Sequence, residues 1–67
     1  MNLIAERLKL LRKEKKITQK ELAELINVKR ENIAKWETGV NKPTLEGIVN
    51  LADFFEVSLD WLVGRDK

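Results

Sequence analysis

Apolar residues recur at helical spacing along most of the chain. Ile4, Leu8 and Leu11 stand at i, i+4 and i+7, so they share one face of a helix that we expect to end near Lys15. No segment of the sequence alternates apolar and polar residues as a half-buried strand would. The pattern therefore predicts an all-α chain.

The second predicted helix has an explicit start signal. Thr18 and Glu21 stand three residues apart and predict a capping box, in which each side chain accepts a hydrogen bond from the other's backbone amide. We expect this helix to begin at Gln19 and to stop at Asn27, because asparagine tolerates the left-handed conformation found just past a helix end. Its predicted inward residues are Leu22, Ala23, Leu25 and Ile26.

Three further helices are predicted in the rest of the chain. The third covers residues 30–37 and is stopped by Gly39. Thr44 caps the fourth helix, and Ser58 caps a short fifth helix that ends at Gly64. The inward residues that the spacing predicts are Ile33 and Trp36 for the third helix, Leu45, Ile48, Leu51, Ala52 and Phe55 for the fourth, and Leu59 and Leu62 for the fifth.

The second and third predicted helices have the spacing of a helix-turn-helix over residues 19–38. Ala23 is the small residue that lets two steeply crossing backbones approach, and Asn27 accepts the positive φ of the turn. Ile33 and Trp36 then give the second helix of the pair two inward anchors one turn apart. Five short helices with this arrangement predict a compact helical domain that is not a simple bundle.

Length and composition limit the classes of function. The 67 residues leave room for a single domain, residues 1–67, and the chain contains no Cys and no His. The commonest catalytic bases, nucleophiles and soft metal ligands are therefore missing, and we expect no enzyme, no metal and no other cofactor. No charged leader precedes a long apolar run, so we expect a soluble cytoplasmic protein without a membrane partner. No segment suggests a small-molecule ligand.

Charge is distributed unevenly along the chain. The balance is +4 over residues 1–16, +1 over residues 17–43 and −3 over residues 44–67. A basic end and an acidic end are expected of a protein that turns one face to phosphates. Solvated helix faces rich in Lys and Glu would give the same asymmetry, so charge alone does not decide between the two interpretations.

Several short motifs together resemble the Cro/CI-type (XRE-like) helix-turn-helix family of phage repressors and small bacterial regulators. They are TQKELA at 18–23, NV at 27–28, IAKWETG at 33–39, Pro43 and VSLDWL at 57–62, and the resemblance covers residues 6–64. It implies a five-helix, lambda-repressor-like domain of a transcriptional regulator that binds double-stranded DNA sequence-specifically. It also implies a repressor that binds a pseudo-palindromic operator as a homodimer through the recognition helix 30–37, and is nucleoid-associated when bound.

The resemblance further implies which residues meet the DNA. By their matching positions, Arg30, Glu31 and Lys35 are expected to contact bases. Arg12 and Glu37 match a basic and an acidic residue that commonly form a structural ion pair. The residues expected at phosphates are Gln19, Lys29, Asn32 and Lys42.

Two positions depart from the family pattern. Asn27 stands where Gly is usual, a mild change because both residues accept the same geometry. Lys29 stands where Ser or Thr commonly caps the recognition helix. Lysine cannot accept hydrogen bonds from helix amides, which costs roughly 1 kcal/mol of capping. We hypothesise that stability was given up at Lys29 for a cation that points at the DNA.

The roles of Phe54 and Trp61, and the function of the whole domain, each allow two interpretations. Two adjacent aromatic residues cannot both face inward on one helix, so we expect Phe55 in the core and leave Phe54 and Trp61 as surface or dimer contacts. A protein-interaction module or an antitoxin-like component could reuse the same fold, and it should show apolar residues on the outward face of the third helix. Residues 65–67 suit either a tail or the start of a linker.

Overall fold

The computed structural model describes residues 3–65, which form five α-helices. They are α1 (Leu3–Glu14), α2 (Gln19–Leu25), α3 (Arg30–Thr38), α4 (Leu45–Phe55) and α5 (Leu59–Val63). The predicted all-α, five-helix domain is therefore confirmed, and none of the helices within residues 3–65 is long and apolar enough to cross a membrane. Of the predicted tail or linker, residues 66–67 lie outside the described part of the chain.

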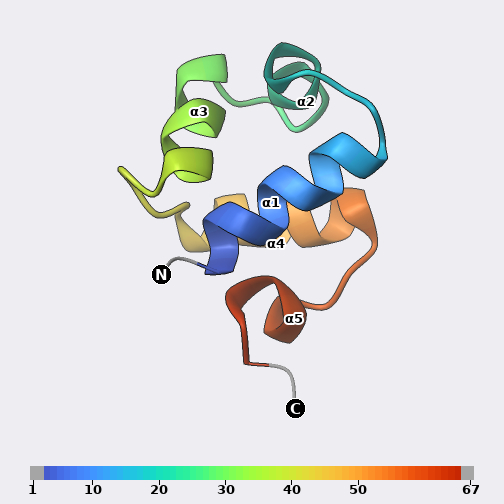
Figure 1. Ribbon diagram of the computed structural model, residues 1–67, viewed down its shortest axis with the longest axis vertical. Helices are drawn as coiled ribbons and strands as arrows, with labels where there is room; N and C mark the ends of the chain where they lie inside the picture. The colour runs from blue at the N-terminus through green and yellow to red at the C-terminus, as the bar shows by residue number, and fades with distance from the viewer. Residues whose placement is uncertain (1–2, 66–67) are drawn as a thin grey trace.

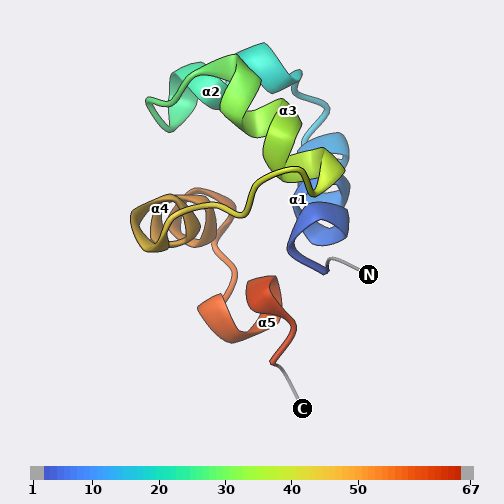
Figure 2. The same cartoon turned by 90° about the vertical axis from the view of Figure 1, so that its left-hand side faces the viewer.

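The helices are arranged along the longest of three unequal axes, which measure 32, 24 and 21 Å. α2 and α3 lie together at one end, α5 lies at the other, and α1 and α4 cross the middle on opposite sides of the molecule (Figures 1 and 2). α3 packs on α2 and α1, and α5 packs on α1 and α4. The helix-turn-helix thus sits on a base formed by the other three helices.

The core takes one fully buried side chain from every helix. These five side chains have no exposed surface: Leu8, Leu22, Ile33, Leu51 and Leu62. Burying a Leu or Ile side chain contributes roughly 1.5–3 kcal/mol, so the five together are a large share of what a small domain can gather. Because α2 and α3 share this core with α1, α4 and α5, the helix-turn-helix is held rigidly on its base.

The starts of α2, α4 and α5 are set by the side-chain caps that the sequence predicts. The Thr18 hydroxyl accepts from the Glu21 amide at 3.0 Å, and the Glu21 carboxylate accepts from the Thr18 amide at 2.8 Å. Thr44 and Ser58 cap α4 and α5 in the same way, since their hydroxyl oxygens accept hydrogen bonds from the amides three residues later. Asn27 lies beyond the end of α2 with φ of 61°, so its predicted left-handed conformation is confirmed.

Three predicted inward residues are wrong. Leu25, Leu45 and Leu59 keep 58%, 76% and 43% of their surface exposed. Leu25 is the last residue of α2, and the other two are the first residues of α4 and α5. Helical spacing identifies the apolar side of a helix. It does not tell whether a neighbouring helix covers the terminal residues of that side, and these three leucines are left exposed.

Candidate nucleic-acid interface

The junction of α2 and α3 is closed by small and apolar residues. Ala23 is buried where the two helices meet, and its carbonyl accepts a hydrogen bond from the Val28 amide at 2.9 Å. Val28 packs against the core from inside the turn, and the predicted anchors Ile33 and Trp36 are both buried. The inner side of α3 is therefore fixed, which leaves its other side to face outward.

The outward side of α3 carries charge. Arg30, Glu31 and Lys35 are all exposed, and they come from the first two turns of α3. Figure 2 shows α3 in front of α1, on the side of the molecule that faces the viewer. The exposed side chains are hydrogen-bond donors and acceptors, which suits base edges better than an apolar protein groove.

Lys29 stands at the N-cap of α3. Its backbone is extended, with φ of −78° and ψ of 143°, and its side chain makes no capping hydrogen bond. The start of α3 therefore presents backbone amides that no side chain caps, beside an exposed lysine. A helix N-terminus and a cation both favour a negatively charged ligand at this point.

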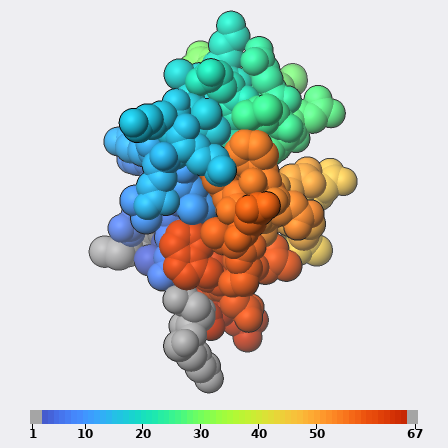
Figure 3. Space-filling view, turned by 90° about the vertical axis from the view of Figure 1, so that its right-hand side faces the viewer, coloured from blue at the N-terminus to red at the C-terminus, as the bar shows by residue number. Residues whose placement is uncertain are grey.

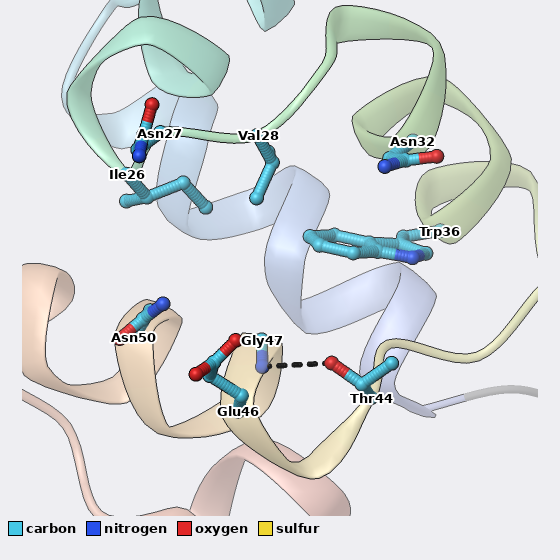
Figure 4. A pocket seen from close by; sticks show the side chains of 9 residues that line it. All are labelled: Ile26, Asn27, Val28, Asn32, Trp36, Thr44, Glu46, Gly47 and Asn50. Atoms are coloured by element: carbon cyan, nitrogen blue, oxygen red, sulfur yellow. Dashed lines mark hydrogen bonds between the residues drawn. The ribbon is translucent and has the colours of Figure 1, made fainter.

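Asn32, one of the residues expected at phosphates, is not fully exposed. Its side chain is half-buried and lines a pocket of about 340 Å³ between the α2–α3 turn and α4. Figure 4 shows Asn32 above the Trp36 ring, with Glu46 and Asn50 of α4 across the pocket. The Glu46 carboxylate makes this pocket unfavourable for a phosphate.

Glu37 joins three helices at one point. Its carboxylate accepts from Arg12 twice, at 2.6 Å from Nε and at 3.0 Å from Nη2. The side-chain amide of Gln19 donates to the same carboxylate at 3.1 Å. Glu37 is buried, whereas Arg12 and Gln19 are half-buried. The resemblance pairs Arg12 with Glu37, but nothing in the sequence indicates that Gln19 belongs to the same group.

Arg12 also reaches the segment that leads into α2. Its Nη1 donates to the Ile17 carbonyl at 2.9 Å. The pKa of Arg12 is raised above its ordinary value, chiefly by the side-chain hydrogen bond to Glu37, while burial acts in the opposite direction. A pKa raised by folding means that the stabilisation is present at every pH below the unfolded value. The guanidinium thus holds its charge and its contacts across the neutral range.

Two of the residues expected at phosphates come from outside α3, and they differ in exposure. Gln19 is the first residue of α2, and Lys42 lies in the segment between α3 and α4. Of the expected phosphate contacts, Lys29 and Lys42 are the exposed cations and Gln19 is the half-buried amide. Within residues 3–65, no group of three or more acidic side chains is placed to hold a metal ion.

Phe54 of α4 and Trp61 of α5 lie close to residues of α1 and of the turn that follows it. Figure 3 shows residues of α1 beside the C-terminal part of α4 and α5. Both rings are half-buried, and each has a cation over it, from Arg7 of α1 and from Lys15, the residue after the end of α1. The Arg7 guanidinium lies 4.7 Å from the centroid of Trp61, and the Lys15 ammonium lies 5.8 Å from that of Phe54. Arg7 also donates a hydrogen bond to the Trp61 carbonyl.

Comparison with known proteins places this geometry in a family. A family model described as helix-turn-helix matches residues 8–62, so the chain belongs to the helix-turn-helix family of the Cro/CI type. The chain is 39% identical over 67 residues to the HTH-type transcriptional regulator AnsR of Bacillus subtilis. The aligned region covers 100% of this chain and 56% of AnsR. The chain is also 39% identical over 62 residues to the HTH-type transcriptional activator BcrR of Enterococcus faecalis. That aligned region covers 92% of this chain and 30% of BcrR.

Solved structures show the same fold. The crystal structure of the P22 c2 repressor in complex with a synthetic operator has a TM-score of 0.89 and 30% identity, over 98% of this chain and 100% of that chain. The lambda-repressor-like architecture is thereby shown. AnsR and BcrR are transcriptional regulators rather than enzymes, and the chain spans 56% and 30% of their respective lengths.

Proposed function

We propose that this chain is the DNA-binding domain of a transcriptional regulator and that α3 enters the major groove of its operator. The observation that carries the proposal is the two-sided character of α3. Ile33 and Trp36 fix its inner side in the core, while Arg30 and Lys35 are exposed on the other side. A recognition helix needs this combination, because its base contacts are specific only if the helix is rigidly placed.

The exposed side chains favour an operator that contains G·C pairs. Arg30 and Lys35 can donate to the O6 and N7 atoms of guanine, and Glu31 can accept from the N4 amino group of cytosine. Phosphates on either side would be held by Lys29 and Lys42, with neutral contacts from the amides of Gln19 and Asn32. The first set gives specificity, and the second gives position and most of the affinity.

A single recognition helix covers only a few base pairs, so we propose that two copies bind a pseudo-palindromic operator. A two-fold dimer would place the two α3 helices about 34 Å apart, one turn of DNA. Phe54 and Trp61, two half-buried aromatic residues that are not part of α3, are the proposed contacts between the two copies. We propose repression as the outcome. The similarity to the P22 c2 repressor, at 30% identity over 98% of this chain, supports repression.

Selection of bound duplexes from random DNA tests the proposal. We expect enrichment of a two-part motif whose halves are related by two-fold symmetry and centred about one helical turn apart. Binding of the enriched duplex should weaken steeply as salt rises, because phosphate contacts release counterions. Absence of any enriched motif even at low salt would overturn DNA recognition and favour a protein-interaction module with the same fold.

A further inference from the structure

We propose that Glu37 is a positioning residue that decides which end of the Gln19 side-chain amide faces a DNA phosphate. The inference rests on the proposed DNA binding and deepens it at one contact. It concerns a residue that does not itself touch the DNA, since the side chain of Glu37 is only 2% exposed.

Arg12 holds the carboxylate of Glu37 in place, and that carboxylate in turn holds the side-chain amide of Gln19. Arg12 bonds both oxygens of Glu37, at 2.6 Å to Oε2 and at 3.0 Å to Oε1. The Gln19 Nε2 atom donates to the Oε1 atom of Glu37 at 3.1 Å. Gln19 is the first residue of α2, so the amide lies at the helix start that faces the phosphate backbone in a helix-turn-helix complex.

The chemistry of the two groups leaves one favourable orientation. An ionised carboxylate only accepts hydrogen bonds, so the amide of Gln19 must turn its nitrogen, and not its oxygen, toward Glu37. That nitrogen carries two N–H groups. One is used by Glu37, and the other remains to donate outward. A DNA phosphate also only accepts, so this second N–H is the group that the phosphate requires.

Without the carboxylate the amide of Gln19 would have no fixed direction. A reversed amide would present its oxygen in place of the nitrogen, and an oxygen repels a phosphate. The same carboxylate is bonded to Arg12 of α1 and belongs to α3. The proposed phosphate contact of Gln19, at the start of α2, is therefore oriented by Glu37 of α3, the proposed recognition helix. This couples the phosphate contact to the base contacts.

Glu37→Gln tests this role, because a glutamine at position 37 can both donate and accept and so no longer selects one orientation of Gln19. Anisotropy titrations would compare four proteins on the same labelled duplexes: wild type, Glu37→Gln, Gln19→Ala and the double variant. We expect each single variant to bind about five-fold more weakly on every duplex, the size of one lost hydrogen bond. The salt dependence should not change, since the lost contact is neutral.

The double variant carries the decisive comparison. If Glu37 acts through Gln19, then Glu37→Gln adds nothing once Gln19 is Ala, and the double variant binds like Gln19→Ala. A double variant weaker by the product of the two losses, or a Glu37→Gln protein that binds like wild type, would overturn the proposal. Glu24→Ala, at an exposed position of α2, is the matched control, and it should leave both the melting temperature and the coupling unchanged.

Side-chain amide NMR of the wild type keeps the proposal testable if Glu37→Gln does not fold. We expect one Gln19 amide proton to be protected from exchange in the free protein, and the other to shift when duplex is added. Two protons that exchange as in a free amide, or a duplex that shifts only the protected proton, would overturn the proposal. A wild-type protein that binds no duplex would instead overturn DNA binding itself.

Discussion

Arg12 of α1 and Glu37 of α3 form a two-point ion pair that is largely removed from water. Their side chains retain 14% and 2% of their surface, and both carboxylate oxygens accept hydrogen bonds. Burying a charge is costly unless it is paired and hydrogen-bonded. Within residues 3–65 no buried side-chain nitrogen or oxygen lacks a partner, so the pair is fully satisfied.

Removing one partner of this pair should cost far more than the pair contributes. We expect Glu37→Ala to lower the free energy of unfolding by about 3–5 kcal/mol, because it leaves the Arg12 guanidinium with its main partner gone. A domain this small has little more than that to lose. Urea unfolding followed by circular dichroism measures the change. Glu24→Ala, at an exposed position of α2, is the control and should change stability by less than about 0.5 kcal/mol. Equal effects of the two variants would contradict the assignment.

Lys29→Ser should separate stability from DNA affinity. A serine hydroxyl can accept from the first amides of α3, which Lys29 leaves without a side-chain cap. We expect the free energy of unfolding to rise by roughly 1 kcal/mol. DNA binding should weaken, and the slope of log affinity against log salt should fall by about 1 as one phosphate contact is lost. A variant that is more stable and binds DNA as well as wild type would refute the hypothesis that Lys29 serves the DNA.

The sequence predicts those parts of the fold that depend on neighbouring residues. Thr18 and Glu21 are three residues apart, and their hydrogen bonds are those that local capping chemistry requires. The exposure of Leu45 could not be predicted in this way, because it depends on how far other helices extend. The bond from Gln19 to Glu37 joins residues 18 positions apart, so it exists only once three helices have packed.

The end of α4 also has no sequence signal. α4 ends at Phe55, and its C-cap residue Glu56 has a left-handed φ of 58° although it is neither Gly nor Asn. We expect Glu56→Gly to raise the free energy of unfolding by about 1 kcal/mol, because glycine adopts this conformation without a steric penalty. Thermal or urea unfolding checks the increase. Asn27→Gly is the comparison, with a smaller gain at φ of 61° because asparagine already tolerates it. A loss of stability in Glu56→Gly would show that Glu56 makes a contact that outweighs the strain.

The proposed pairing surface is tested by removing one ring. Trp61→Ala should leave the affinity of one copy for a half-site unchanged and weaken cooperative binding to the full operator. The reason is that Trp61 is not among the residues proposed to meet the DNA but is part of the proposed contact between copies. Sedimentation of the complex gives the number of copies bound. Leu25→Ala removes an exposed apolar side chain of α2 and should leave the pairing intact. Unchanged cooperativity in Trp61→Ala would place the contact elsewhere.

Base contacts and phosphate contacts should fail in different ways, and Arg30 and Lys42 offer a matched pair of exposed cations. Arg30→Ala should cost about 1–3 kcal/mol on the selected operator and relax the preference at one base pair. Lys42→Ala should weaken binding to every duplex alike and reduce the salt slope by about 1.

Repeating the selection from random DNA with both variants distinguishes these outcomes. The motif enriched by Lys42→Ala should match that of wild type, whereas the motif enriched by Arg30→Ala should lose one position in each half. If Arg30→Ala kept the full motif and only bound more weakly, then Arg30 would be a phosphate contact. Base recognition would in that case fall to Glu31 and Lys35, the other two exposed side chains expected to meet bases.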